Sequence, residues 1–409
     1  MQSSKLSSPQ LIFVVCSAQL LGYLDVSFWP ALLPDLSRTW SLSNREAGCI
    51  TAMHYGAYLL SAPLLLTLTD RVASKAIYLF GVTGTAAGAL CFATVADGFW
   101  GAVAARALGG IGEAGRFMVG VKLLADHMGG RELSRGVAWN ALTTGVAAAI
   151  SYVCIDPISQ TVGWRTAFVI AAIATVLAGL IIWFLVPGSN PGRTPTREIM
   201  FDLRPVLVNR AVMAYVIAYF VHTFESVGFR SWVVAFLAYS AADQIGGTAM
   251  PAPTVIAMAM VLCGTAASFF GSELALRVGQ GALVFFALIA SAGLASVIGF
   301  AGANFYGLAV ALVLAYGIAI YLDSAALTAG TSNSAEPLRR GTTLAIHSSI
   351  GYVGGAIGPV LIGVVLDFFG GMSQRAWGLA FLLLGVIDVL GLTLFWLMRP
   401  SKERRGPSS

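Results

Sequence analysis

Long apolar segments separated by short polar ones run through the whole chain. A helix needs about 20 apolar residues to cross about 30 Å of hydrocarbon, and the sequence supplies twelve segments of that kind. The stretch from Val278 to Leu322 has no charged residue and is too long for one span, so we divide it at the glycine-containing segment 301–304. The predicted spans are 11–33, 47–68, 76–96, 98–122, 136–157, 164–186, 211–236, 253–273, 281–301, 304–327, 342–366 and 376–398.

The composition supports this interpretation. Of the 409 residues, 57% are hydrophobic and 11% are charged, whereas a soluble domain carries about 25% charged residues. The mean hydropathy is +0.80. The first apolar segment continues through Asp25, Trp29 and Pro30 without a small-residue cleavage site, so we interpret it as a membrane helix and not as a removed signal peptide. The sequence therefore predicts an all-α, multi-pass membrane protein.

Lysine and arginine predict the orientation of the spans. With the N-terminus inside, 17 of these residues fall in cytoplasmic segments and 5 in outer segments. The other two, Arg106 and Arg116, lie inside a span. We therefore expect both termini in the cytoplasm and the protein in a plasma membrane, specifically a bacterial inner membrane. The net charge of +5 is accounted for by these loops, so no nucleic-acid partner is expected. The five cysteines show neither metal-ligand spacing nor a disulfide framework.

Three landmarks recur at a nearly constant offset along the chain. Arg71 and Arg277 are 206 residues apart, Arg-Gly pairs at 135 and 340 are 205 apart, and Trp-x-x-x-Phe motifs at 164 and 377 are 213 apart. Each landmark occupies the corresponding position relative to the predicted spans in its half of the chain. This repeat predicts two six-helix bundles of the same orientation with the substrate site between them. The predicted parts are the bundle 1–186, a cytoplasmic linker 187–210, the bundle 211–398 and a cytoplasmic tail 399–409.

Two motifs give the chain a resemblance to a known family. Residues 106–112, Arg-Ala-Leu-Gly-Gly-Ile-Gly, are similar to the helix 4 signature R-x-x-x-G-x-G of the major facilitator superfamily. Residues 68–75 resemble its signature between helices 2 and 3, with Leu66 and Ala73 where glycines are expected, and 272–279 form a fainter copy. The helix 5 signature of antiporters is not visible in 144–150. The resemblance covers nearly the whole chain and implies this family's fold of twelve transmembrane helices in two pseudo-symmetric bundles.

Ionisable residues inside the spans are the candidate site. Such residues are costly in hydrocarbon and usually functional. The resemblance implies that helices 1, 4, 7 and 10 line the central cavity, and most of these residues lie on those helices. Three further residues, His54, His347 and Asp388, lie in other spans and receive no role. The predicted substrate and proton site consists of Asp25, Arg106, Glu113, Arg116, His222, Glu225 and Asp323.

Helix 4 holds three of these charges. At about 1.5 Å per residue, Asp25 and Arg106 lie at about the same depth, so we expect them to form an ion pair. Glu113 follows Arg106 by nearly two turns and is then left as the candidate proton carrier. The alternative is that Glu113 and Arg116, three residues apart on one face, neutralise each other.

Two further hypotheses concern the second half. Arg116 and Asp323 occupy corresponding positions in the repeat, which suggests an ion pair that closes an inner gate, and the alternative is that Asp323 pairs with His347. His222 lies one turn from Glu225 and is either a proton relay or a packing histidine.

The family resemblance also implies a conformational latch. It would be formed by residues in the loops after spans two and eight. These are Asp70, Arg71, Lys75 and Arg277.

The functional prediction is a proton-coupled secondary transporter of a small organic solute. Interior arginines suit an anion and interior acids suit protons, which favours organic anion symport by alternating access. The alternative is a proton-antiporting exporter of drugs or cations. The chain has no P-loop and no H-E-x-x-H or G-x-S-x-G motif, so neither an ATP-driven pump nor an enzyme is expected, and no cofactor is implied. The expected partners are the substrate, protons and the lipid bilayer, with a monomer as the functional unit.

Overall fold

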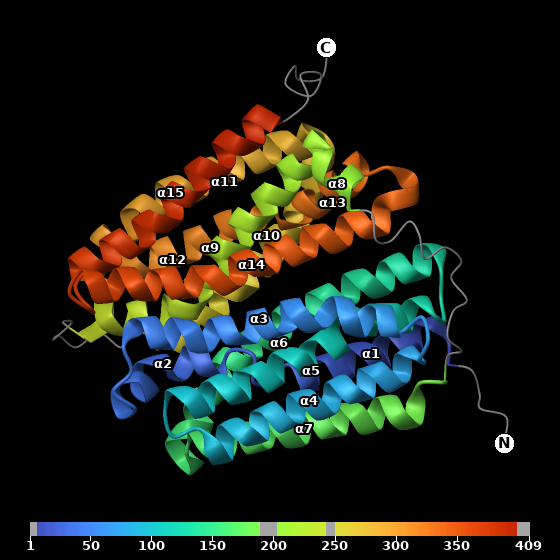
Figure 1. The fold of residues 1–409 in the computed structure, drawn as a ribbon. Helices are drawn as coiled ribbons and strands as arrows, with labels where there is room; N and C mark the ends of the chain where they lie inside the picture. Colours follow the sequence, from blue (N-terminus) through green and yellow to red (C-terminus); the bar gives the residue numbers. More distant parts are fainter. Residues whose placement is uncertain (1–5, 189–202, 243–249, 399–409) are drawn as a thin grey trace. The chain divides into compact units, whose positions relative to one another are not determined.

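Helices account for almost all of the computed structural model, which describes residues 6–188, 203–242 and 250–398 (Figure 1). The described residues contain no strand. Contacts between helices divide the chain into two compact units, Met1–Leu42 with Cys49–Thr194 and Ser43–Gly48 with Pro195–Ser409. The tail 399–409 and most of the linker, residues 189–202, lie outside the described residues.

The first unit contains the helices up to residue 185, except that the first residues of α3, up to Gly48, belong to the second unit. These helices lie lengthwise beside one another (Figure 1). Their bounds are α1 Ser8–Gly22, α2 Phe28–Thr39, α3 Asn44–Leu68, α4 Ser74–Val95, α5 Phe99–Ala125, α6 Gly130–Val162 and α7 Trp164–Leu185.

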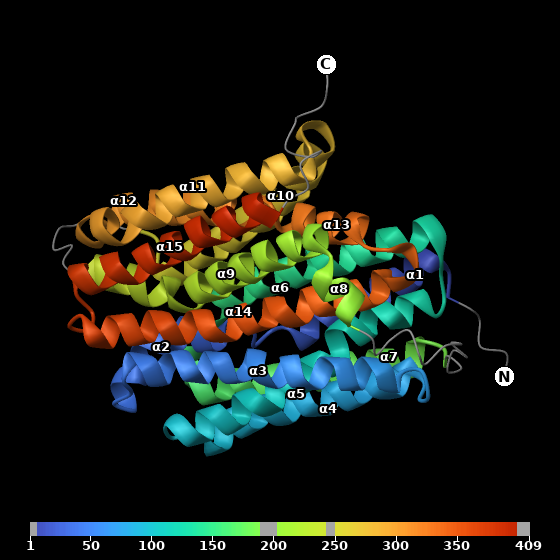
Figure 2. The ribbon, with the colours of Figure 1, turned by 45° about the horizontal axis from the view of Figure 1, so that its top comes forward.

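The second unit is built around α9, which packs against α14 and α15 (Figure 2). Most of its side chains from Val212 to Ser240 are buried, so it is the core helix of this unit. The elements are α8 Arg204–Val208, α9 Arg210–Ala242, α10 Pro253–Val278, α11 Gln280–Ala301, η1 Gly302–Asn304, α12 Tyr306–Leu322, α13 Ser324–Ser334, η2 Pro337–Arg339, α14 Arg340–Phe368 and α15 Gln374–Met398.

Hydrophobic patterning predicted most of these helices. Among the described residues, ten helices are long and apolar enough to cross a membrane. The 27-residue α5 is not among the ten, although it occupies the predicted span 98–122, because its sequence carries Arg106, Glu113 and Arg116. The division at 301–304 is confirmed by the 3-10 turn η1. The total of twelve spans stays a prediction.

Two predicted spans are not continuous helices. The span 11–33 is interrupted by a turn at residues 23–27. Pro30 explains this break, because a proline inside a helix cannot donate to the carbonyl four residues earlier and its ring collides with it. The span 304–327 is interrupted at Asp323, which ends α12 and precedes α13. Each break places an acidic residue, Asp25 or Asp323, where the helical hydrogen bonding is incomplete.

Glycines set the spacing between α4 and α5. A Cβ atom added at Gly81 would lie 2.6 Å from the backbone of Gly115, and one added at Gly88 would lie 2.6 Å from the backbone of Gly109. Small residues of this kind let membrane helices approach closely. This contact fixes α5, and with it the three charged side chains that α5 carries, against α4.

The Gly112→Val variant tests this contact. A Cβ at Gly112 would lie 2.1 Å from the backbone nitrogen of Thr85, so the two helices would have to separate. Overpacking costs about 1–3 kcal/mol, and we expect about 3 kcal/mol here because backbone is the obstacle. Thermal unfolding of the detergent-solubilised protein measures the loss. The matched control is Gly293→Val on α11, where a Cβ meets no atom within 4 Å. Equal melting temperatures for the two variants would contradict the packing argument.

Candidate functional site

A cavity within the first unit collects the charged residues of α5. Its lining comes from the turn between α1 and α2 and from α3, α4, α5 and α7. The charged or titratable side chains on its wall are Tyr23, Asp25, His54, Arg106, Glu113 and Arg116. Apolar residues such as Ala89, Phe92 and Phe168 complete the wall. Two cations and two carboxylates therefore share one small cavity.

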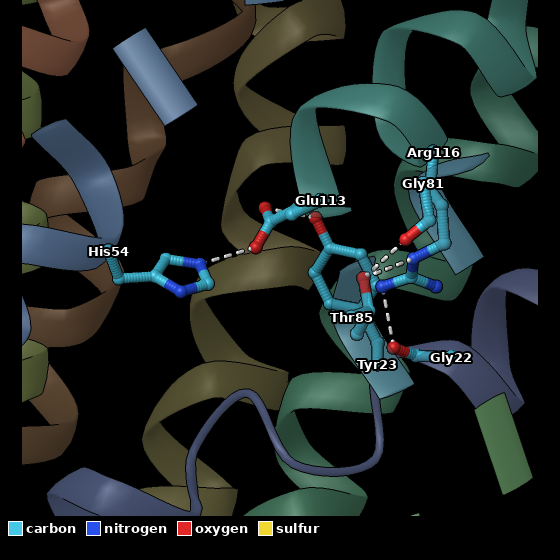
Figure 3. A network of polar contacts seen from close by, with 7 residues as sticks. All are labelled: Gly22, Tyr23, His54, Gly81, Thr85, Glu113 and Arg116. Atoms are coloured by element: carbon cyan, nitrogen blue, oxygen red, sulfur yellow. Dashed lines mark hydrogen bonds and ion pairs between the residues drawn. The ribbon is translucent and has the colours of Figure 1, made fainter. Parts of the chain in front are cut away.

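Glu113 is held by two hydrogen bonds from other elements (Figure 3). The Tyr23 hydroxyl donates to Oε1 of Glu113, and Nε2 of His54 lies 2.6 Å from Oε2. The Glu113 side chain is 12% exposed, and the other ring nitrogen of His54, Nδ1, has no hydrogen-bond partner in the described part of the chain. One proton thus lies between Glu113 and His54, and His54 has a second nitrogen that can exchange it.

Arg116 is hydrogen-bonded to the end of α1, where the turn at residues 23–27 interrupts the first predicted span. Its Nη2 donates to the carbonyl of Gly22 at 2.6 Å, and its Nε donates to Oγ1 of Thr85 at 3.0 Å (Figure 3). The guanidinium lies 5.3 Å from the centre of the Tyr23 ring. A Cβ at position 22 would lie 1.8 Å from Nη1, so a larger residue there would displace the guanidinium. The guanidinium is thus held by α1, by α4 and by the ring of Tyr23.

The predicted alternative of a Glu113–Arg116 pair is not what the structure shows. Glu113 bonds to Tyr23 and His54, and Arg116 bonds to Gly22 and Thr85. Nη1 of Arg116 is buried without a hydrogen-bond partner among the described residues. The Arg116 side chain lines the cavity, so its guanidinium is a candidate to bind an anionic ligand.

Thr85→Val tests how Arg116 is positioned. The variant keeps the shape of the side chain but removes the acceptor of the Arg116 Nε hydrogen bond, which leaves part of a buried cation unsatisfied. We expect a loss of about 1–3 kcal/mol in stability, measured by thermal unfolding. Thr83→Val is the matched control, because Thr83 is exposed on the same helix and its hydroxyl donates to the carbonyl of Phe80. If both variants melt at the same temperature, the Thr85 hydroxyl does not stabilise Arg116.

Asp25 and Arg106 both line this cavity, as the sequence suggested from their depth. Asp25 lies in the turn between α1 and α2, and Arg106 is buried on α5. Asp25 interacts electrostatically with Arg106 and also with Arg116 and His54. A direct ion pair between Asp25 and Arg106 stays a prediction.

In the second unit, Asp323 pairs with a different histidine from the one predicted. Nδ1 of His222 lies 3.1 Å from Oδ1 of Asp323, and both side chains are buried. His347 instead contacts Thr331 at 2.9 Å and stacks on Tyr219, with ring centres 3.8 Å apart. The alternative Asp323–His347 pair is therefore wrong, because Thr331, which holds His347, lies about two turns of α13 beyond Asp323. The Arg116–Asp323 gate joins residues of two units and stays a prediction.

The predicted latch residues lie at helix ends. Asp70, Arg71 and Arg277 are exposed. Lys75 has a defined contact within its own unit, because Nζ donates to the carbonyls of Trp183 and Val186, each at 2.7 Å. Lysine at this position satisfies carbonyls at the end of α7. The latch itself stays a prediction.

Sequence reasoning missed part of this site. The sequence assigns His54 no role, and Thr85 is not among the predicted site residues. Tyr23 is likewise absent from the predicted site. The buried histidine in an apolar span was the available signal, but no spacing connects residue 54 to residue 113, since they lie on different helices.

Comparisons with known proteins agree with this architecture. The family model described as Major Facilitator Superfamily matches residues 15–271. "Sphingosine-1-phosphate transporter SPNS2" of Mus musculus is 22% identical over 93% of this chain and 75% of that protein. "Protein spinster homolog 1" of Bos taurus is 23% identical over 56% of this chain and 46% of that protein, about half its length.

A solved structure extends the likeness to the whole fold. It is that of a bacterial homolog to the human lysosomal transporter Spinster, in an inward-facing and occupied conformation. It superposes with a TM-score of 0.79 at 15% identity, covering 97% of this chain and 98% of that one. At this identity the likeness concerns the fold alone.

Proposed function

The chain belongs to the Major Facilitator Superfamily, and from its charged cavity we propose that it carries a small organic anion across the membrane together with a proton. It is a multi-pass membrane protein and a secondary transporter, not an enzyme. The observation that carries the proposal is the balance of charge in the cavity of the first unit. Arg106 and Arg116 there face Asp25 and Glu113, so the charges cancel when His54 is neutral.

An anion that enters this cavity upsets the balance. An uncompensated charge in a low-dielectric space costs several kcal/mol, so a bound monoanion needs one further positive charge. The His54–Glu113 pair supplies a place for it, because a proton added there turns the net charge of the pair from negative to neutral. Binding of the anion and binding of the proton therefore favour each other, which is the thermodynamic requirement for symport.

The cations are placed to receive the anion. Both Arg106 and Arg116 line the cavity, and a guanidinium is well suited to carboxylate and phosphate groups. The name of the mouse relative assigns sphingosine-1-phosphate to that protein. Its phosphate group is one member of the class of anions that this cavity suits, so we include it among the substrates to be tested.

Uptake into proteoliposomes tests the proposal. The test panel contains a monocarboxylate, sphingosine-1-phosphate and a lipophilic organic cation, each offered with and without an inward proton gradient. We expect the gradient to accelerate uptake of at least one anion and not of the cation. Cation movement driven by an oppositely directed gradient would instead favour a proton-antiporting exporter, and uptake of every compound at a gradient-independent rate would reject proton coupling.

A further inference from the structure

A second pair of carboxyl groups is buried in the second unit. Glu225 lies on α9 and Asp388 on α15, two helices that pack against each other. Glu225 is 1% exposed and Asp388 is fully buried. Each interacts electrostatically with the other. Two acidic side chains therefore lie next to each other inside a membrane-embedded helical unit.

The hydrogen bonding of this pair is incomplete. Both carboxyl oxygens of Asp388 and Oε1 of Glu225 have no hydrogen-bond partner within the described residues. The buried hydroxyl of Tyr316 on α12 lies against Glu225 and interacts with both acids. Ser291 on α11 also lies against Glu225. Buried polar groups are nearly always satisfied, so three carboxyl oxygens without a donor at one place indicate that a donor is missing.

Nearby groups do not neutralise the pair. The basic group that acts on Glu225 is His222, and His222 already pairs with Asp323 at 3.1 Å. The remaining titratable neighbours, Tyr316 and Asp323, add no positive charge. On α14, which also packs against α9, His347 contacts Thr331 and stacks on Tyr219. Two adjacent carboxylates cannot both remain ionised under these conditions.

We propose that Glu225 and Asp388 bind a proton between them, so that one is a carboxylic acid that donates to the carboxylate of the other. The added proton comes from water and creates the missing donor, while Tyr316 and Ser291 supply hydroxyl donors to the remaining charge. This site goes beyond the proposed symport. The Glu225–Asp388 pair binds its proton whether or not the cavity of the first unit couples substrate transport to protons. It assigns a role to Asp388, for which the sequence suggested none.

Infrared spectroscopy of the detergent-solubilised protein tests the assignment. A protonated carboxyl group gives a carbonyl-stretch band that ionised groups lack and that shifts in heavy water. The spectrum of the wild type minus that of the double variant Glu225→Gln with Asp388→Asn isolates the pair from other acids. We expect a protonated-carboxyl band in this difference at neutral pH, and no such band for the exposed control Glu336→Gln. Absence of the band from the first difference would overturn the proposal.

Thermal unfolding provides a second readout. The wild type is expected to lose stability in alkaline buffer as the proton leaves, whereas the double variant, which has neutral amides, is not. Exchange of sodium for choline is expected to leave both unchanged. A sodium-dependent stabilisation of the wild type that the double variant lacks would show that a metal cation, and not a proton, occupies the site. If the double variant does not fold, the single variant Glu225→Gln replaces it in the infrared difference spectrum. The carboxyl band of Asp388 is then expected to shift or disappear.

Discussion

Glu113→Gln is expected to abolish uptake driven by a proton gradient while exchange of substrate across the membrane continues. Glutamine keeps the size of the side chain and can still accept from the Tyr23 hydroxyl. It cannot bind or release a proton, so the His54 contact no longer holds a transferable one. The variant therefore behaves like a carrier with a permanently bound proton. It can exchange substrate across the membrane, but it cannot perform net uptake driven by protons.

The measurement compares gradient-driven accumulation with counterflow in the same proteoliposomes. Accumulation is expected to fall to the level of empty liposomes, with counterflow retained. The matched control is Glu132→Gln, an exposed residue of the same unit, which is expected to accumulate substrate normally. Accumulation by Glu113→Gln at the wild-type level would remove Glu113 from the coupling mechanism.

Arg116→Gln is expected to raise the KM for organic anions by roughly 10- to 150-fold. A hydrogen bond to a charged group contributes about 1.5–3 kcal/mol, and about 1.4 kcal/mol corresponds to a tenfold change in affinity. The expectation depends on the Arg116 guanidinium, which lines the cavity while its Nε and Nη2 bind Thr85 and Gly22.

This variant also loses two structural hydrogen bonds, so its KM is compared with that of Thr85→Val, which loses one of them and keeps the cation. Arg165→Gln, at the exposed start of α7, is the control for loss of a positive charge. An increase in KM confined to Arg116→Gln supports an anion-binding role. Equal increases in Arg116→Gln and Thr85→Val would mean that Arg116 only positions other groups.

Local patterns predicted much of the fold. Apolar segments of about 20 residues correspond closely to helices such as α7 and α11, because hydrophobic length is what a bilayer selects. The interruption at residues 23–27 was missed, although Pro30 signalled it, since proline is tolerated in membrane helices as well. The interruption at Asp323 had no comparable signal in the sequence.

The sequence predicts which charged residues belong to the site, but not which residues they pair with. Arg106, Glu113 and Arg116 were identified because charge in an apolar segment is rare. Their partners could not be found by spacing, because Glu113 bonds to residues 59 and 90 positions away. In the second unit, His222 lies 101 residues before Asp323, and the nearer His347 was the wrong choice. Pairings across helices depend on how the helices are rotated, which periodicity does not determine.

Simultaneous recording of proton entry and anion uptake tests the central claim most directly. Proteoliposomes that enclose a pH-sensitive dye are given the transported anion with the membrane potential clamped at zero. We expect addition of the anion to acidify the interior with wild-type protein, and Glu113→Gln to eliminate this acidification. Anion uptake by the wild type without any acidification would contradict the central claim.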